Sequence, residues 1–318
     1  METKGSKTLV TAKVNPDLDG VSCTLAYADL LKQEGTEING VITGSPQSEV
    51  RYFIEKHNIS IPTRPDENST DWNKFILVDA SSMKGMPKVV IPDRVVEIID
   101  HRTGEPEREF PNARIQNEII GAAATIIVER FIKVGKKINP DYAMLLYGAI
   151  YHNTLNFIAT NTTGRDRKAV RYLETNYNLN EGVIREMFDF ATREVEADVK
   201  TALEDDAKEF GEGWKIGAYQ LVVWGSEIFS DKKLIEESVR NLKDKMGADW
   251  SFVNIIDLEA RNSHIYSESD DGGEIISEAL GAEFRNGWIT LPAILRKQIM
   301  PKVNEVTDNE NERFRSKA

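Results

Sequence analysis

The fold of this chain is decided by the stretch FILVD at residues 75–79, in which four apolar residues are followed by an aspartate. A short and continuous apolar run is typical of a strand that is buried on both faces, as in a parallel sheet covered by helices. The run VVEIID at residues 95–100 has the same form and also ends in an aspartate. Two such runs predict neighbouring parallel strands whose carboxyl ends carry polar side chains.

Strand-like and helix-like segments alternate around these two runs. The helical segments repeat apolar residues at a spacing of three or four, whereas the other segments are short and rich in β-branched residues. Further strands are expected at residues 8–14 and 38–42, and helices at residues 21–31 and 48–56. This alternation predicts an α/β domain with a parallel sheet and helices on both faces.

The second half of the chain changes its pattern near residue 200. Residues 121–200 are nearly all helical in their spacing. The small residues GAAAT at 121–125 are typical of a helix start that allows close approach of a phosphate or of the sheet, or alternatively close packing of helices. Beyond them we expect strands at residues 215–224, 250–258 and 262–269, and helices at residues 232–247 and 272–281. The chain is therefore predicted to have domains at residues 1–190 and 201–318, the second a smaller α/β domain, with a helical linker at residues 191–200.

Composition excludes several classes of function. The 318 residues include 52 acidic and 40 basic side chains, which give a formal charge of -12 and argue against broad binding to nucleic acid through phosphates. Cys23 is the only cysteine, so the chain has no intrachain disulfide and no thiol cluster for a metal. No run of about 18 apolar residues predicts a membrane span. We expect a cytoplasmic protein with neither nucleic acid nor membrane as a partner.

Acidic residues follow three of the predicted strands. Asp17 and Asp19 follow the first strand, Asp79 ends the FILVD strand, and Asp100 and His101 end the VVEIID strand. Because ligands of open α/β sheets bind beyond the carboxyl ends of the strands, we expect these side chains to share one site. Carboxylates together with an imidazole suit Mn2+, and also Mg2+ or Co2+. The alternative is a set of separate turns and caps, in which Asp19 caps the following helix and Asp17 lies in a turn.

Four stretches of the first half resemble the motifs of the DHH phosphoesterases. They are NPDLDGVSC at residues 15–23, FILVDASS at 75–82, IIDHR at 98–102 and GAIYHNTLNF at 148–157. In the second half, DAKEF at 206–210, GAYQ at 217–220 and LRKQIMP at 295–301 resemble signatures of the DHHA2 domain. The resemblance is to the branch that contains manganese-dependent inorganic pyrophosphatases and exopolyphosphatases, and it runs in order from Thr8 to Pro301.

This resemblance implies a function and a set of site residues. A phosphoanhydride, such as pyrophosphate or a short or long polyphosphate, would be hydrolysed by metal-activated water in a cleft between the two domains. The implied cofactor is Mn2+ or Mg2+, with Co2+ as a further candidate. The implied metal ligands are Asp17, Asp19, Asp79 and His101; the catalytic residues are Asp79, His101, Arg102 and Lys208; and the substrate-binding residues are Lys13, Arg102, Lys208, Arg296 and Lys297.

The chain departs from the pattern of this family at four positions. Lys13 stands where the family has a histidine ligand, Asn153 replaces an aspartate ligand, Arg102 replaces the second histidine of Asp-His-His, and Leu295 replaces an arginine. These changes leave a second hypothesis open, in which a catalytically degenerate relative binds phosphate ligands or a protein partner without turnover. A homodimer is compatible with either hypothesis.

Lys13 allows two interpretations from the sequence alone. Its ammonium group could neutralise Asp17 and Asp79 and take the place of one cation, which would leave a site for a single metal ion. Alternatively, its side chain could extend outward from the end of the strand, with the charge in solvent.

Overall fold

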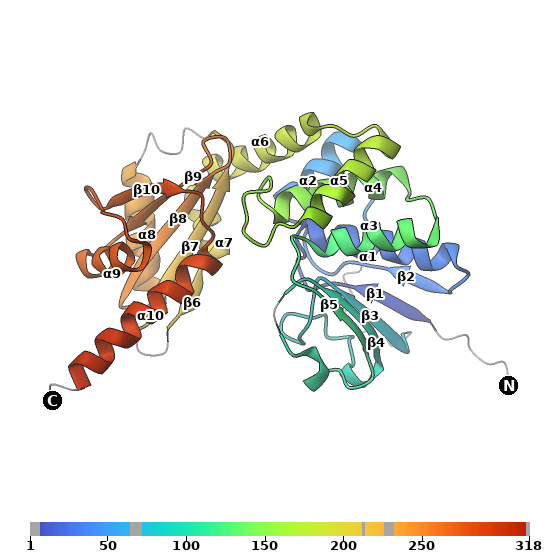
Figure 1. The fold of residues 1–318 in the computed structure, drawn as a ribbon, viewed down its shortest axis with the longest axis horizontal. Coiled ribbons are helices and arrows are strands. Elements are labelled where there is room, and N and C mark those ends of the chain that lie inside the picture. Colours follow the sequence, from blue (N-terminus) through green and yellow to red (C-terminus); the bar gives the residue numbers. More distant parts are fainter. Residues whose placement is uncertain (1–6, 64–71, 103, 212–213, 226–231, 316–318) are drawn as a thin grey trace. The chain divides into compact units, whose positions relative to one another are not determined.

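The chain is described by a computed structural model that covers residues 7–63, 72–102, 104–211, 214–225 and 232–315. It divides into two compact units, Met1–Met187 and Phe188–Ala318. The division lies within helix α6 (Glu181–Ala197), which is followed by α7 (Val199–Asp206). The predicted α/β class with two domains is confirmed, and each unit is considered below by itself (Figure 1).

The first unit is built on a parallel sheet of five strands in the order β2-β1-β3-β4-β5. The strands are β1 (Thr8–Thr11), β2 (Ile38–Gly40), β3 (Lys74–Val78), β4 (Val95–Asp100) and β5 (Arg114–Asn117). The apolar runs of β3 and β4 are almost entirely buried, as their sequences predict. Strand β5 was not predicted, because the sequence RIQN at the edge of the sheet has no apolar run.

Helices gather on one face of this sheet (Figure 1). They are α1 (Leu18–Gln33), α2 (Ser48–His57), α3 (Ala123–Val134), α4 (Pro140–Asn153) and α5 (Gly164–Tyr177). Helix α1 packs on α3 and α4 as well as on the sheet, and most of its residues are buried on all sides. Because α1 is central, its first turn lies between the end of β1 and the start of α3.

The other face of the first sheet is closed mainly by irregular chain, so the expectation of helices on both faces is wrong for this sheet. Met86, Val90 and Phe110 from the segments that flank β4 complete a core with Phe75 and Ile98 from the strands. Two short 3-10 helices lie in these segments, η1 (Pro92–Arg94) and η2 (Pro106–Arg108). Prolines interrupt these stretches and remove backbone donors, so a long helix cannot form there.

The second unit contains a mixed sheet of five strands in the order β10-β9-β8-β7-β6. Strands β7 and β8 are parallel, and the other neighbours are antiparallel. The strands are β6 (Lys208–Phe210), β7 (Ile216–Val223), β8 (Trp250–Asp257), β9 (Asn262–Ser267) and β10 (Trp288–Pro292). The short edge strand β6 was not predicted, since its sequence KEF has only one apolar residue.

Each face of the second sheet has its own apolar core. One core joins the sheet to α7 and α8 (Lys232–Met246), with Leu203 and Val239 buried against Tyr219. The other joins it to α9 (Asp270–Leu280) and α10 (Arg296–Arg315), with Ile276 and Ile299 buried. The predicted elements of this half are present within a few residues of their expected bounds.

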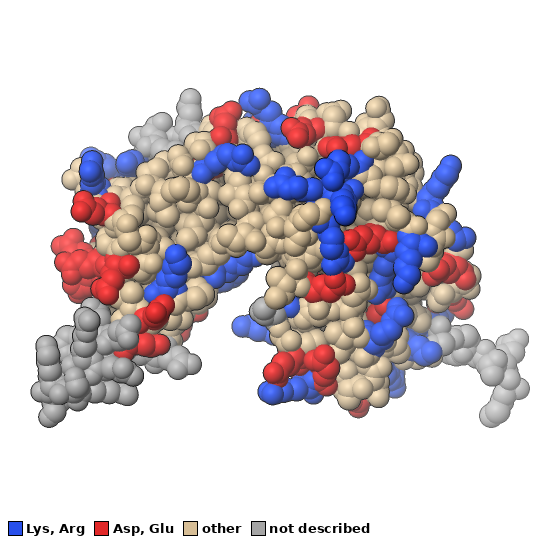
Figure 2. All heavy atoms as spheres, in the orientation of Figure 1, with Lys and Arg blue, Asp and Glu red and all other residues tan. Residues whose placement is uncertain are grey.

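Two general features of the described residues complete the fold. Acidic and basic side chains are interspersed over the face drawn in Figure 2, in keeping with the moderate excess of acidic residues in the sequence. Among the helices that the structure describes, none combines the length and the apolar character that crossing a membrane requires.

Candidate metal centre

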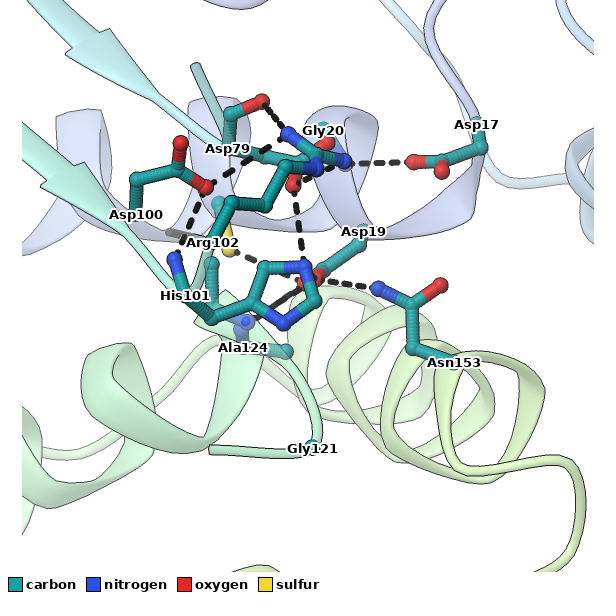
Figure 3. Close-up of polar contacts among 12 residues, drawn as sticks. Asp17, Asp19, Gly20, Asp79, Asp100, His101, Arg102, Gly121, Ala124 and Asn153 are labelled. Carbon is teal, nitrogen blue, oxygen red and sulfur yellow. Dashed lines mark hydrogen bonds and ion pairs between the residues drawn. The ribbon is translucent and has the colours of Figure 1, made fainter. Parts of the chain in front are cut away.

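Three ligand side chains meet at the carboxyl edge of the first sheet. Asp19 lies in the first turn of α1 beyond β1, Asp79 follows the last residue of β3, and His101 follows β4. Because β1, β3 and β4 are parallel neighbours, their ends lie side by side. One ligand atom from each of the three residues lies within 4.8 Å of the others, and Figure 3 shows the three side chains pointing toward one another.

The distances between these atoms fit a divalent ion. His101 Nε2 is 3.4 Å from Asp79 Oδ1 and 3.7 Å from Asp19 Oδ2. Octahedral ions such as Mg2+ hold oxygen ligands at about 2.1 Å, which places adjacent ligand atoms about 3 Å apart. The three side chains would therefore need to move together only slightly to enclose an ion.

One buried atom of the cluster also lacks a partner. His101 Nε2 is inaccessible to solvent and has no hydrogen-bond partner among the described residues, whereas the equally buried Asp79 Oδ1 is paired with the charge of Arg102 Nη2 at 2.8 Å. Leaving a buried polar group without a hydrogen bond is costly, and a coordinated cation would satisfy His101 Nε2. The imidazole is prepared for this role, because its Nδ1 lies 3.1 Å from the carbonyl oxygen of Ile120. A proton held on Nδ1 by that carbonyl leaves the lone pair of Nε2 for a metal.

The electrostatics of the cluster point in the same direction. Burial, followed by the charge of Asp79, raises the pKa of Asp19 to about 7. Burial and the charge of Asp17 raise the pKa of Asp79. Burial lowers the pKa of His101, but the adjacent carboxylates of Asp79 and Asp19 outweigh it and raise this pKa to about 9. Buried negative charge therefore draws protons into the cluster, and a divalent cation would replace them.

Asp19 is positioned by the start of helix α3. Its carboxylate oxygens accept hydrogen bonds from the backbone N–H groups of Ala123 and Ala124, both at 2.8 Å. Ala122, the N-cap residue of α3, has no side chain that could cap the helix. Asp19 thus supplies the missing cap from α1, and the small residues at 121–125 allow its close approach.

The alternative assignment of caps drawn from the sequence is wrong. Asp17, and not Asp19, is the N-cap of α1, because its side chain accepts a hydrogen bond from Gly20 N at 3.0 Å. Asp17 lies outside the three-residue cluster that the described residues form (Figure 3). Its part as a fourth metal ligand remains a prediction.

The backbone at Asp79 and Gly20 brings the ligands close together. Asp79 has a left-handed conformation with φ of 51°, which is uncommon for a residue other than glycine and directs the chain sharply out of β3. A Cβ atom at Gly20 would lie 3.0 Å from the side chains of Ala12 and Pro16, and 3.6 Å from Asp79 Oδ2. Glycine at position 20 therefore allows the first turn of α1 to approach β1 and Asp79.

Asn153 reaches the cluster from the end of α4. Its Nδ2 donates a hydrogen bond to Asp19 Oδ2 at 2.5 Å. The amide therefore presents a hydrogen to the carboxylate, and its oxygen would face an ion only after the group turned over. Replacement of a carboxylate by this amide removes one negative charge from the site.

Arg102 is the cation that neutralises Asp79. Its Nη2 lies 2.8 Å from Asp79 Oδ1, and its Nη1 donates a hydrogen bond to the backbone oxygen of Asp79 at 2.5 Å. Its Nη1 is also 3.4 Å from Asp100 Oδ1. Lys13 forms no ion pair with any residue that the structure describes, and its aliphatic chain lies against Gly85. The neutralising role considered for Lys13 is thus taken by Arg102.

The remaining predicted residues lie in the second unit. Lys208 begins β6 and Lys297 lies in the first turn of α10, and both are exposed. Arg296 is buried and forms an ion pair with Asp206, and its Nη1 donates to the carbonyl oxygen of Ala218 at 2.9 Å. The guanidinium of Arg296 is therefore engaged inside the second unit.

Three backbone groups that contribute to the centre were missed from the sequence, namely the carbonyl of Ile120 and the N–H groups of Ala123 and Ala124. Backbone groups carry no side-chain signal, so a motif does not reveal them. The absence of a polar N-cap before the helix at 123–134 was the one available signal, since it predicts a cap from elsewhere in the chain.

Comparison with known proteins connects this geometry with a family. Residues 7–150 match the profile of the DHH family, N-terminal domain. A protein of Shouchella clausii described as "Probable manganese-dependent inorganic pyrophosphatase" is 28% identical over 315 residues, which cover 96% of this chain and 99% of the relative. A protein of Exiguobacterium sp. with the same description is 25% identical over 309 residues, which cover 94% of this chain and 98% of the relative.

Solved structures show the same fold. A protein of Methanococcus jannaschii, provisionally described as a family II inorganic pyrophosphatase, matches with a TM-score of 0.70 at 22% identity and covers 94% of this chain and 99% of its own. An exopolyphosphatase-related protein from Bacteroides fragilis matches with a TM-score of 0.51 at 14% identity and covers 95% of this chain and 92% of its own. Both likenesses concern the arrangement of the chain.

Proposed function

Because residues 7–150 form an N-terminal domain of the DHH family, we propose that this chain is a metal-dependent phosphoesterase that hydrolyses a phosphoanhydride, with pyrophosphate and polyphosphate as the candidate substrates. The observation that carries this proposal is the cluster of Asp19, Asp79 and His101, in which the buried ligand atom His101 Nε2 lacks a hydrogen bond. The names of the pyrophosphatase relatives support the same class of reaction.

The proposed cofactor is Mn2+, with Mg2+ or Co2+ as alternatives. Asp19, Asp79 and His101 would hold it, and Asp17 is a further candidate at the start of α1. Bound there, such an ion supplies an activated water molecule and electrostatic stabilisation of phosphoryl oxygens. One imidazole and several carboxylates form the mixed nitrogen and oxygen set that suits Mn2+. The relatives described as manganese-dependent favour this ion.

The basic residues are assigned to the substrate and to its support. Arg102 lies on Asp79 of the cluster and Lys13 follows the end of β1, and we assign the positive charge of both to the phosphate oxygens. Lys208 and Lys297 are exposed residues in the segments that resemble the DHHA2 signatures, and on that resemblance we assign them to the phosphate chain. Arg296 was also expected to bind substrate, but its contacts with Asp206 and Ala218 favour a role in holding the segment that carries Lys297.

One observation favours the second hypothesis, binding without turnover. Asn153 donates an amide hydrogen to Asp19 and Arg102 occupies Asp79, so both carboxylates are already engaged without an ion. A protein with such a site could bind phosphate ligands and release them unchanged.

Phosphate release distinguishes the two hypotheses. The purified full-length chain is freed of metal with a chelator and then supplied separately with Mn2+, Mg2+ and Co2+. Each sample receives pyrophosphate, tripolyphosphate or long-chain polyphosphate, and released phosphate is measured against a sample kept with chelator. We expect release that depends on the metal and is greatest with Mn2+. Absence of metal-dependent release from all three substrates would exclude the proposed hydrolysis and leave the binding hypothesis.

A further inference from the structure

We propose that the guanidinium of Arg102 serves as a built-in second cation, so that the centre holds one divalent ion at Asp19, Asp79 and His101 and has no place for another. The inference rests on the proposed function in one respect, because it requires the cluster to bind a metal. It goes beyond that function in setting the number of ions and in giving Arg102 the place of a second ion at Asp79, in addition to its assignment to phosphate oxygens.

The first argument is that Arg102 and the metal cluster share one carboxylate. Asp79 Oδ1 lies 3.4 Å from His101 Nε2 on one side and 2.8 Å from Arg102 Nη2 on the other. Figure 3 shows the guanidinium beside Asp79 and Asp100, and the imidazole facing Asp79 and Asp19. Asp79 can therefore join one ion to a neighbouring cation, and that neighbouring cation is already a side chain.

The second argument is that Arg102 is anchored in this place. Its Nη1 donates to the backbone oxygen of Asp79 at 2.5 Å and lies 3.4 Å from Asp100 Oδ1. Asp100 is itself held, because its Oδ1 accepts a hydrogen bond from His101 N at 2.8 Å. A planar guanidinium fixed by several acceptors leaves less readily than a single-point ammonium would. A second ion at Asp79 would have to displace it.

The third argument concerns charge. Asp79 and Asp100 lie in contact with the guanidinium, and Asp17 lies at the start of α1 near it (Figure 3). A guanidinium keeps its positive charge in proteins, so the charge on Arg102 is permanent. A second divalent ion brought against this fixed positive charge would be repelled strongly in a partly buried site.

Lys13, the other basic residue that follows a strand end, is not expected to exclude a second ion. Lys13 forms no ion pair within the described part of the chain, and its Cδ lies 3.9 Å from where a Cβ of Gly85 would be. Its ammonium can approach an incoming phosphate, whereas Arg102 is held at the carboxylates. The inference therefore predicts that the metal stoichiometry depends on Arg102 and not on Lys13.

The test is to count bound Mn2+ in the full-length chain. The metal-free protein is titrated with Mn2+, free ion is measured by electron paramagnetic resonance, and bound ion is measured after equilibrium dialysis. We expect one equivalent per chain for the wild type, and a saturated spectrum of an isolated Mn2+ ion without coupling to a second one. Arg102→Gln removes the charge and should bind a second equivalent, which the wild type does not. Arg102→Lys retains the charge and should remain at one equivalent.

A surface arginine provides the matched control. Arg108 forms an exposed ion pair with Glu105, so Arg108→Gln makes the same chemical change away from the centre and should leave one equivalent. Lys13→Gln should also leave one. A wild type that binds two coupled ions would overturn the inference, as would an Arg102→Gln variant that stays at one. A wild type that binds no Mn2+ would overturn the proposed metal centre itself. The coupling measurement on the wild type decides the question even if Arg102→Gln fails to fold.

Discussion

His101 Nε2 lies 3.4 Å from Asp79 Oδ1, and this buried nitrogen has no hydrogen-bond partner among the described residues. Arg102 Nη2 lies 2.8 Å from the same oxygen of Asp79. A buried polar atom without a hydrogen bond is unusual in a folded protein, and His101 Nε2 together with the Asp79 carboxylate marks a position at which a cation would be stabilised. The predictions below test what this pair and its neighbours do.

The first prediction concerns Asp79 as a ligand. Asp79→Asn replaces a charged oxygen with a neutral amide at the centre of the cluster, so Mn2+ binding should weaken by at least about a hundredfold and metal-dependent phosphate release should be lost. Binding is measured by titration and release by a phosphate assay. Asp93→Asn, at an exposed position of η1, is the matched control and should change neither quantity. Unchanged release in Asp79→Asn would show that the strand-end carboxylates do not form a common centre.

The second prediction concerns the pH dependence of the metal-free protein. The pKa of His101 is raised from 6.5 to about 9 in the folded state. A raised folded pKa contributes stability that is fully present below the unfolded value and is lost as pH rises through the folded value. The melting temperature of the metal-free protein should therefore fall between pH 6.5 and about 9, and the raised pKa of Asp19 adds a loss at lower pH, between about 4 and 7.

Thermal unfolding across this range, with chelator present, measures the effect. His101→Gln should flatten the fall between pH 6.5 and 9, whereas His264→Gln should retain it, because burial lowers the pKa of His264. Saturating Mn2+ should remove most of the fall in the wild type, since the ion replaces the protons. A melting temperature that rises with pH in the metal-free wild type would contradict the assigned charges.

The third prediction concerns Asn153. Asn153→Asp places a carboxylate against Asp19, where Asn153 Nδ2 now donates a hydrogen bond. Without metal the added like charge should lower the free energy of unfolding by about 1–3 kcal/mol, because a hydrogen-bond donor is lost beside a buried carboxylate. With Mn2+ the new carboxylate becomes an additional ligand, and affinity should rise by about tenfold or more.

Calorimetric titration measures the Mn2+ affinity of the variant, and denaturant unfolding measures its free energy of unfolding without metal. Asn112→Asp makes the same change at an exposed position, where Asn112 donates to the backbone oxygen of Asp93, and should alter Mn2+ affinity little. If Asn153→Asp leaves both affinity and stability unchanged, Asn153 does not face the centre in solution.

The fourth prediction separates Arg296 from Lys297. Arg296→Gln leaves Asp206 without its ion-pair partner and several acceptors without a donor, so the second unit should lose about 2–3 kcal/mol of stability. Lys297→Gln changes an exposed side chain and should leave stability unchanged while raising KM for the phosphate substrate. Denaturant unfolding and steady-state kinetics report the two effects. An unchanged KM in Lys297→Gln together with a stable Arg296→Gln would reverse the assignment.

Much of the fold could be predicted because the central strands have a local sequence pattern that is specific to buried strands. The runs at 75–79 and 95–100 agree with β3 and β4 to within one residue, since a fully buried strand needs continuous apolar side chains. Strands β5 and β6 were missed for the converse reason, as short edge strands need few apolar residues and are formed by pairing with a neighbour. The course of the chain beneath the first sheet likewise depends on packing rather than on periodicity.

By itself, the sequence determined that Asp19, Asp79 and His101 follow parallel strands, and this suffices to bring them to one edge, because parallel strands end on the same side of a sheet. Only the tertiary structure decided what each side chain does there. In the folded chain Asp17 caps α1, and Asp19 accepts hydrogen bonds at the start of α3. Arg102, rather than Lys13, forms the ion pair with Asp79. These roles depend on distances of a few ångströms between segments far apart in the chain, which packing sets and residue order does not record.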